Sequence, residues 1–142
     1  MYKDKIISVV VPCHNEESQI EAVVIGLPEY IDKIVIIDDK SNDETVQIIK
    51  KLKNVNNKII SIFHNKNQGV GAAIASGYKW SRDNNIDIAV VMAGDNQMDP
   101  KDLPAILDPL VQDNVDYSKG NRLFSGEAYK KIPKMRYLGN SV

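Results

Sequence analysis

The feature that most constrains the fold is a fourfold alternation of β-branched apolar runs with stretches that carry apolar residues at helical spacing. The apolar runs cover residues 6–11, 34–37, 59–63 and 88–92, and a weaker one covers 115–119. Continuous Ile and Val runs are typical of strands buried on both faces of a parallel sheet. Units of about 25 to 30 residues are typical of a sheet wound by right-handed crossovers. We therefore predict an α/β fold, with a mostly parallel central sheet flanked by helices.

Local signals set the expected ends of these elements. Pro12 should end the pairing of the first strand, because proline lacks a backbone N–H. Ser41 and Glu44 have the spacing of a capping box, which predicts a helix start there. Asp99 should cap a later helix, with Pro100 at its first position.

Length and composition fit one globular domain. The chain has 142 residues, of which 43% are hydrophobic, and contains no linker-like or low-complexity stretch, so residues 1–142 are expected to form one domain. A formal net charge of -1 gives no field that would favour nucleic acid. The single cysteine, Cys13, excludes an internal disulfide, fits a reducing compartment and is expected to be a small buried side chain. No signal peptide or membrane-spanning stretch is recognisable.

Polar residues follow each of the four main strands. They occupy 14–16, 38–39, 64–69 and 95–97. In parallel α/β sheets, ligands bind outside the carboxyl ends of the strands. We therefore expect these four loops to meet at one edge of the sheet and form a binding site.

Two of the loops carry carboxylates that could bind a ligand. Asp95 and Gln97 can both present oxygen to Mg²⁺ or Mn²⁺, although a plain polar turn would have the same residues. Asp38 and Asp39 can accept hydrogen bonds from ribose hydroxyls or a base N–H, unless one caps a helix and the other is solvated.

The histidines and glycines allow two interpretations. His14 and His64 are either ligands or bases, or hydrogen-bonded structural groups. Gly69 and Gly71 do not form a dinucleotide-binding fingerprint, because Ile74 stands where the third glycine is required. They more simply let a helix N-terminus approach a ligand or the sheet.

The C-terminal part of the chain is locally basic. Residues 119–136 contain six Lys or Arg residues and one acidic residue. This imbalance fits a phosphate site, an anionic membrane surface or a solvated loop. The chain stops at 139–142 without a helix end or a turn, so we expect it to be a fragment of a longer protein.

Five segments resemble, in order, the motifs of family 2 glycosyltransferases. VVVPCHNEE at 9–17 resembles V-V-I-P-x-Y-N-E-E, DDKSNDET at 38–45 resembles D-D-x-S-x-D-x-T, and NQGVGAA at 67–73 resembles N-x-G-x-G-x-A. GDNQMDP at 94–100 and KGNR at 119–122 resemble the metal motif and the G-[SN]-R element of the polyprenyl-phosphate (dolichyl-phosphate) sugar transferase branch.

The resemblance implies a Rossmann-like GT-A sandwich that binds a nucleoside-diphosphate sugar and inverts the anomeric centre. It further implies Mg²⁺ or Mn²⁺ as cofactor, held by Asp95 and Gln97, and catalytic roles for Asp95 and Arg122. The implied nucleotide-sugar-binding residues are Pro12, His14, Glu16, Asp38, Asp39, Gly71 and Asp95. The implied contacts to an acceptor phosphate are Arg122, Arg136 and Asn140.

Two positions depart from the family pattern. His14 stands where the family often has Tyr, which changes the stacking or hydrogen bonding available there. Ala93 stands where the family often has an acid, so one carboxylate ligand is absent. Metal binding should therefore depend more on the diphosphate of the substrate.

These observations lead to three functional hypotheses. The first is transfer of a hexose from a GDP- or UDP-linked donor to a polyprenyl phosphate, whose anionic oxygen needs no dedicated base. It places the protein in the cytoplasm, at the cytoplasmic face of the membrane, where it would be held by the part beyond Val142 and serve cell-envelope or protein glycosylation. The second is transfer to a hydroxyl of a polysaccharide or glycolipid. The third is a nucleotide-binding module without catalysis.

Overall fold

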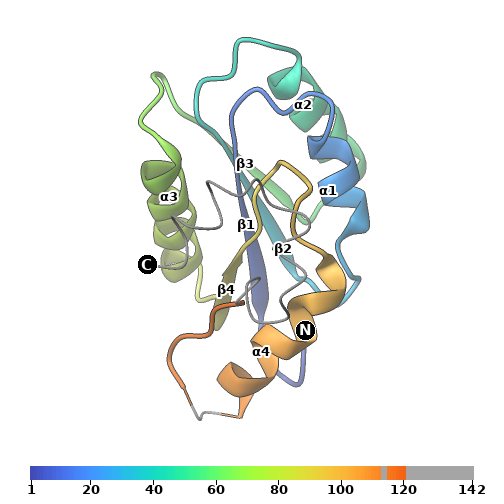
Figure 1. The fold of residues 1–142 in the computed structure, drawn as a ribbon, viewed down its shortest axis with the longest axis vertical. Helices are drawn as coiled ribbons and strands as arrows, with labels where there is room; N and C mark the ends of the chain where they lie inside the picture. Colours follow the sequence, from blue (N-terminus) through green and yellow to red (C-terminus); the bar gives the residue numbers. More distant parts are fainter. Residues whose placement is uncertain (113–114, 121–142) are drawn as a thin grey trace, which may run out of the picture. The chain divides into compact units, whose positions relative to one another are not determined.

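The computed structural model describes residues 1–112 and 115–120, and its helices and strands alternate along the chain (Figure 1). It divides into two compact units, Met1–Leu103 and Pro104–Val142. The sheet and all the loops discussed below belong to the first unit. Its elements are β1 (Ile7–Cys13), α1 (Ile20–Gly26), β2 (Lys33–Asp38), α2 (Thr45–Val55), β3 (Ile59–Phe63), α3 (Val70–Asp83), β4 (Ile88–Val91) and the 3₁₀ helix η1 (Pro100–Asp102).

The described strands form one parallel sheet in the order β3-β2-β1-β4. β1 lies in the middle, where Val9 pairs with Ile34 of β2 and with Val90 of β4. The chain returns to β4 on the far side of β1, which makes β1 and β4 the point where the strand order reverses. The predicted α/β fold with a parallel sheet between helices is confirmed, and β3 begins and ends where the sequence predicted.

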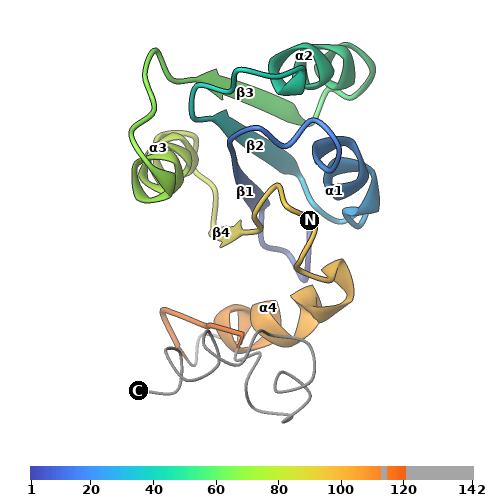
Figure 2. The ribbon, with the colours of Figure 1, turned by 45° about the horizontal axis from the view of Figure 1, so that its top comes forward.

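Helices cover both faces of the sheet, with α3 on one side and α1 and α2 on the other (Figure 2). On the α3 side, Val10, Val35 and Ile37 are fully buried against Ala73 of the helix. Gly77 lies on the same helical face, and a Cβ atom there would come within 2.3 Å of Val10 Cγ1. This glycine therefore permits the close approach of α3 to the sheet.

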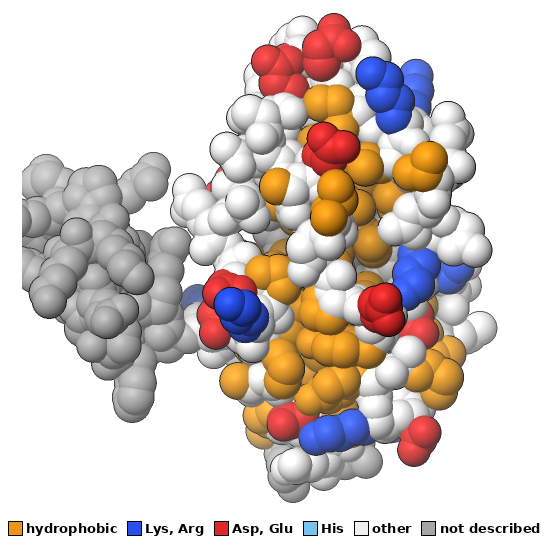
Figure 3. All heavy atoms as spheres, turned by 90° about the vertical axis from the view of Figure 1, so that its right-hand side faces the viewer, with side chains coloured by type: hydrophobic (Ala, Val, Ile, Leu, Met, Phe, Trp, Pro, Cys, Tyr) orange, Lys and Arg blue, Asp and Glu red, His pale blue; other side chains and the backbone are white. Residues whose placement is uncertain are grey.

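The side of the molecule that carries α1 and α2 has hydrophobic side chains gathered in its surface (Figure 3). A hollow of about 360 Å³ lies here between the ends of the two helices, lined by Val24, Ile31 and Leu52 among others. Ile25 and Val55 at its border are 71% and 84% exposed.

Two expectations about element ends need correction. Pro12 does not end β1, because it pairs with Ile37 of β2. The backbone N–H that proline lacks would face β4, and the pairing of β1 with β4 has already stopped at Val91. Ser41 does not cap a helix, because its hydroxyl binds another loop and α2 begins at Thr45.

Residues 115–120 contain no strand, so the predicted strand at 115–119 is wrong. The predicted cap at Asp99 is confirmed, since its Oδ1 accepts from the Lys101 amide at 2.9 Å with Pro100 at the first helical position. The next helix, α4, spans Leu103–Val111. None of the helices in residues 1–112 and 115–120 combines the length and hydrophobicity that crossing a membrane requires.

Candidate functional site at the carboxyl edge of the sheet

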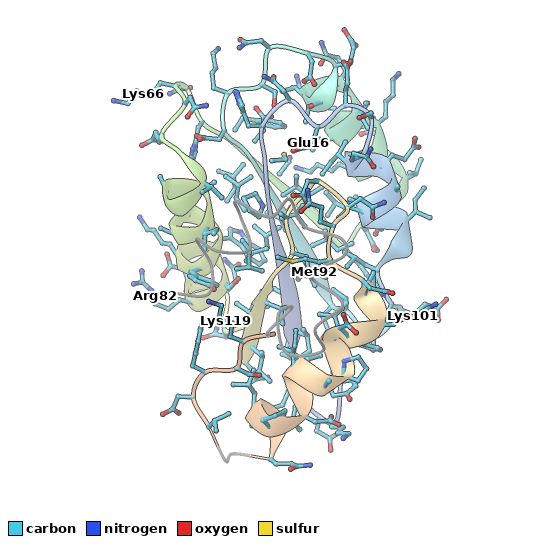
Figure 4. The ribbon with its side chains drawn as sticks, viewed as in Figure 1. Glu16, Lys66, Arg82, Met92, Lys101 and Lys119 are labelled. Carbon is cyan, nitrogen blue, oxygen red and sulfur yellow. The ribbon has the colours of Figure 1, made fainter. Side chains whose placement is uncertain are left out.

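The loops after the four strands leave the same end of the sheet, and those after β1, β2 and β3 are uppermost in Figure 1. Figure 4 shows Glu16 among the loops at this end, with Met92 below it and Lys66 on the loop between β3 and α3. The convergence follows from topology, because every strand is parallel and every loop leaves from a carboxyl end. The four polar clusters therefore meet at one edge, as predicted.

The Asp39 side chain accepts three hydrogen bonds at this edge. Its Oδ1 accepts from His64 Nδ1 at 2.7 Å and from the Gln68 amide at 2.9 Å. Its Oδ2 accepts from the Gly69 amide at 2.7 Å. The residue is only 3% exposed, so the carboxylate ties the loop between β3 and α3 to the end of β2.

The environment keeps the Asp39 carboxyl ionised. Burial alone would raise its pKa, but hydrogen bonds from the Gln68 amide, His64 and the Gly69 amide together lower the pKa below its usual range. An ionised carboxylate only accepts, so His64 carries a proton on Nδ1. His64 Nε2 in turn lies 2.9 Å from Ser76 Oγ on α3.

His14 is held in the same tautomer by a different partner. Its Nδ1 donates to the backbone oxygen of Asp39 at 2.9 Å, which leaves Nε2 as an acceptor. The Asn15 and Asn67 amide groups point toward that nitrogen, at 3.2 and 3.4 Å. The imidazole is exposed at the edge of the sheet, and its hydrogen bond to Asp39 fixes its orientation there.

The loops after β1 and β2 are joined by a set of hydrogen bonds that the sequence did not reveal. The Asn15 amide donates to Ser41 Oγ and its Oδ1 accepts from the Asn42 amide, both at 2.8 Å. The Glu16 amide donates to Thr45 Oγ1 at 2.8 Å. Asn15 has φ 54°, a conformation that asparagine tolerates better than most residues. The only signal in the sequence was the density of Asn, Ser, Asp and Thr in both loops.

Three of the expected nucleotide-site residues contribute no side chain to the hydrogen bonds described so far. Pro12 is buried in β1, where its carbonyl accepts from the Gly94 amide at 3.1 Å. Gly71 is exposed in the first turn of α3. Asp38 points to the opposite face of the sheet, toward a hollow of about 340 Å³ lined also by Lys50 and Phe63.

Asp38 is 2% exposed, and its Oδ2 accepts from the Ser41 amide at 3.1 Å, while its Oδ1 has no partner within the described residues. Cys13 lies on the same face and is buried, as predicted. Burial, followed by the charge of Asp38, raises the pKa of its thiol far above the usual range, which removes it as a nucleophile.

The pKa of Glu16 depends on its burial and on acidic residues of other loops. Burial raises the pKa of Glu16, and the negative charges of Asp95 and Asp43 raise it further. Asp95 Oδ1 accepts from the Gln97 amide at 3.1 Å in a turn where Asn96 has φ 56°. Gln97 is exposed beside it.

The oxygen donors of this site suit a hard divalent cation whose coordination is completed by a bound ligand. Asp95 and Gln97 offer oxygen ligands. Burial is the main cause of the raised Glu16 pKa, and the negative charges of Asp95 and Asp43 add a smaller contribution that a cation would offset. Within residues 1–112 and 115–120, no group of three or more His, Cys, Asp or Glu side chains is arranged to hold a metal. Such a site needs substrate phosphate as a further ligand, which is the usual situation for Mg²⁺.

The other expected site residues, Arg122, Arg136 and Asn140, lie outside the described residues. Most of the basic segment 119–136 does so as well.

Comparison with known proteins gives one family match over most of the chain. The model of the family described as glycosyl transferase family 2 matches residues 8–140.

Curated relatives match across most of the chain. A UDP-N-acetylglucosamine–dolichyl-phosphate N-acetylglucosaminyltransferase of Methanococcus voltae is 35% identical over 96% of this chain. An undecaprenyl-phosphate 4-deoxy-4-formamido-L-arabinose transferase of Aeromonas hydrophila is 28% identical over 83% of it. The chain spans 60% and 38% of the length of these two relatives.

Among solved structures, the glucosyl-3-phosphoglycerate synthase of Mycobacterium tuberculosis, in complex with Mn²⁺, UDP and glucosyl-3-phosphoglycerate, superposes with a TM-score of 0.57. The match covers 76% of this chain and 40% of that one, at 22% identity. At this identity the likeness concerns the fold.

Proposed function

Because the chain belongs to glycosyl transferase family 2, we propose that it is the donor-binding part of a metal-dependent, inverting glycosyltransferase that moves a hexose from a nucleoside-diphosphate sugar to a polyprenyl phosphate. The predicted GT-A sandwich is confirmed by the parallel sheet and by the likeness to solved structures. The observation that supports the proposal is the convergence of four loops at one edge of the parallel sheet, next to the point where the order of strands reverses.

The chemical problem in such a transfer is the negative charge that develops on the departing nucleoside diphosphate. A bound Mg²⁺ or Mn²⁺ would supply Lewis-acid stabilisation of this charge. In our proposal Asp95 and Gln97 hold the cation, and Glu16 adds negative charge behind it. The fixed imidazole of His14 and the carboxylate of Asp39 position the nucleoside.

The acceptor is proposed from the relatives and from the sequence. Both curated relatives are named for transfer to a polyprenyl-type phosphate, dolichyl or undecaprenyl. A phosphate acceptor is already anionic near neutral pH, so it needs cationic positioning in place of a general base. We assign this positioning to Arg122, Arg136 and Asn140. Because the acceptor is a lipid, catalysis would take place at a membrane surface, and we propose its cytoplasmic face.

The role of Asp95 can be tested with a substitution that preserves the fold. Asp95→Asn keeps the oxygen that accepts from the Gln97 amide but removes the negative charge. Asp102→Asn makes the same chemical change at an exposed position of η1 and serves as the control. We expect Asp95→Asn to lower metal-dependent transfer to a polyprenyl phosphate by at least about a hundredfold, because metal-held charge stabilisation is worth several kcal/mol.

Transfer is measured with a labelled nucleotide sugar and Mn²⁺, in the protein that contains this chain, and thermal unfolding is recorded for each variant. The control should keep wild-type transfer. Wild-type transfer by a folded Asp95→Asn variant would refute the assigned role.

A further inference from the structure

The carboxylate of Asp39 has little accepting capacity left for a ligand. An ionised carboxylate offers about four acceptor positions, two on each oxygen. His64 Nδ1 and the Gln68 amide fill both positions on Oδ1, at 2.7 and 2.9 Å. The Gly69 amide fills one position on Oδ2, at 2.7 Å. One position on Oδ2 therefore remains.

We infer that His64 is a specificity-determining residue of the donor site, which leaves Asp39 able to accept a single N–H and so selects a uracil-type base over guanine. The inference rests on the proposed function, because it assumes that Asp39 faces the base of a nucleoside diphosphate. It adds the identity of the base to that proposal. In this inference His64 does not contact the ligand, but acts by occupying an acceptor position of Asp39.

The three donors on Asp39 are fixed by the fold. The His64 side chain is 7% exposed, and its other ring nitrogen lies 2.9 Å from Ser76 Oγ on α3. The Gln68 and Gly69 amides belong to the loop that enters the same helix, where Gly69 has φ 87°, a value that favours glycine. A base therefore cannot displace one of these donors without moving the start of α3.

Uracil, guanine and cytosine differ at the position that would face the carboxylate. Uracil presents one N–H between two carbonyl groups, which matches one free acceptor position. Guanine presents two adjacent N–H donors, and both carboxylate oxygens are needed to accept them. Cytosine has the ring shape of uracil but presents a lone pair at the equivalent nitrogen, which the carboxylate repels.

A donor for the flanking carbonyls is close at hand. Asn67 Oδ1 accepts from the same Gly69 amide at 3.1 Å, so its carboxamide lies next to the Asp39 carboxylate. Asn67 Nδ2 reaches the ring of His14 only at 3.4 to 3.5 Å. This long contact leaves Nδ2 available to donate to a carbonyl oxygen of the base.

The first test compares three nucleotides on the unmodified 142-residue chain. Titration calorimetry with UDP, CDP and GDP in the presence of Mn²⁺ should show UDP binding about tenfold or more tightly than either of the others, since each of them loses or misplaces a hydrogen bond to a charged group. GDP binding as tightly as UDP would overturn this inference and leave the proposed function standing. Failure of all three nucleotides to bind would contradict both.

The second test changes His64 in two ways. His64→Ala opens an acceptor position on Oδ1, so the ratio of the GDP and UDP dissociation constants should fall several-fold. His64→Asn places an amide N–H close to where Nδ1 lies and should keep the ratio near that of the wild type. The ratio is insensitive to the fraction of folded protein, which circular dichroism monitors in parallel.

A His64→Ala ratio equal to that of the wild type would refute the role of His64. The preference for the base itself is decided on the unmodified chain, and the ratio measured with His64→Asn tests the role of His64 even where the alanine variant does not fold.

Discussion

The position of α3 determines where the amides that hold Asp39 lie, and Gly77 determines how closely α3 approaches the sheet. A Cβ atom added at Gly77 would lie 2.3 Å from Val10 Cγ1 and 3.0 Å from Ile37 Cδ1. The optimum separation of two such carbons is about 3.5 to 4.0 Å. Val10 and Ile37 are both fully buried β-branched residues of the sheet, so they cannot rotate away. Gly77→Ala must therefore lift α3 by about 1 Å or more.

The expected cost follows from two opposing contributions. Overpacking of a close-packed core costs about 1 to 3 kcal/mol, and a 2.3 Å contact belongs at the upper end of that range. Alanine in place of glycine inside a helix returns about 1 kcal/mol. The free energy of unfolding should therefore fall by about 2 kcal/mol.

Gly71→Ala is the matched control in the same helix, because a Cβ atom there meets nothing within 4 Å. It should stabilise the protein by about 0.5 to 1 kcal/mol. Urea unfolding followed by circular dichroism measures both variants through their midpoints. Gly77→Ala should lower the midpoint and Gly71→Ala should raise it. A Gly77→Ala midpoint equal to or above that of the wild type would refute the packing argument.

Two further predictions concern the loops. Burial alone would raise the pKa values of Asp39 and Asp43, but hydrogen bonds hold both below the usual range. The two ionised carboxylates therefore stabilise the folded protein. This stability is complete above the unfolded pKa of about 3.9 and is lost as the pH falls through the folded pKa values. The urea midpoint should therefore fall steadily below about pH 4, and a midpoint that stays constant down to pH 3 would contradict this. Asn15→Gly should cost about 1 kcal/mol through the lost bond to the Asn42 amide, and Asn15→Ala about 1 kcal/mol more, because alanine is strained at φ 54°. Equal midpoints for these two variants would show that backbone strain at Asn15 contributes nothing.

The sheet could be predicted from the sequence because its signals are local. The Ile and Val runs define the strands, and parallel pairing follows from the helical stretches between them. The strand predicted at 115–119 is wrong because β-propensity in a short run does not ensure a neighbouring strand to pair with. The prediction that Pro12 ends β1 is wrong for a related reason. A strand tolerates the missing N–H of proline where no neighbouring strand requires it, and at Pro12 this depends on where β4 stops.

The gathering of the polar loops at one edge could also be predicted, because it depends only on topology. Their internal bonding could not. Ser41 and Glu44 have the spacing of a capping box, yet Ser41 binds Asn15 from a loop 26 residues away. Likewise, nothing local to Asp39 indicates that His64 and the Gly69 amide would occupy its oxygens. Contacts between loops distant in sequence decide these roles.

The central claim is that these loops surround one site for a cation and a diphosphate, and paramagnetic broadening by Mn²⁺ tests it most directly. In the presence of UDP, Mn²⁺ should broaden the backbone amide signals of Glu16, Gly69 and Gln97 together, from three different loops. The amides of Asp32 and Asp87, which bond to the beginning of β1 at the other end of the sheet, should stay sharp, and Mg²⁺ should broaden none of them. Broadening confined to one loop, or spread over both ends of the sheet, would contradict the account.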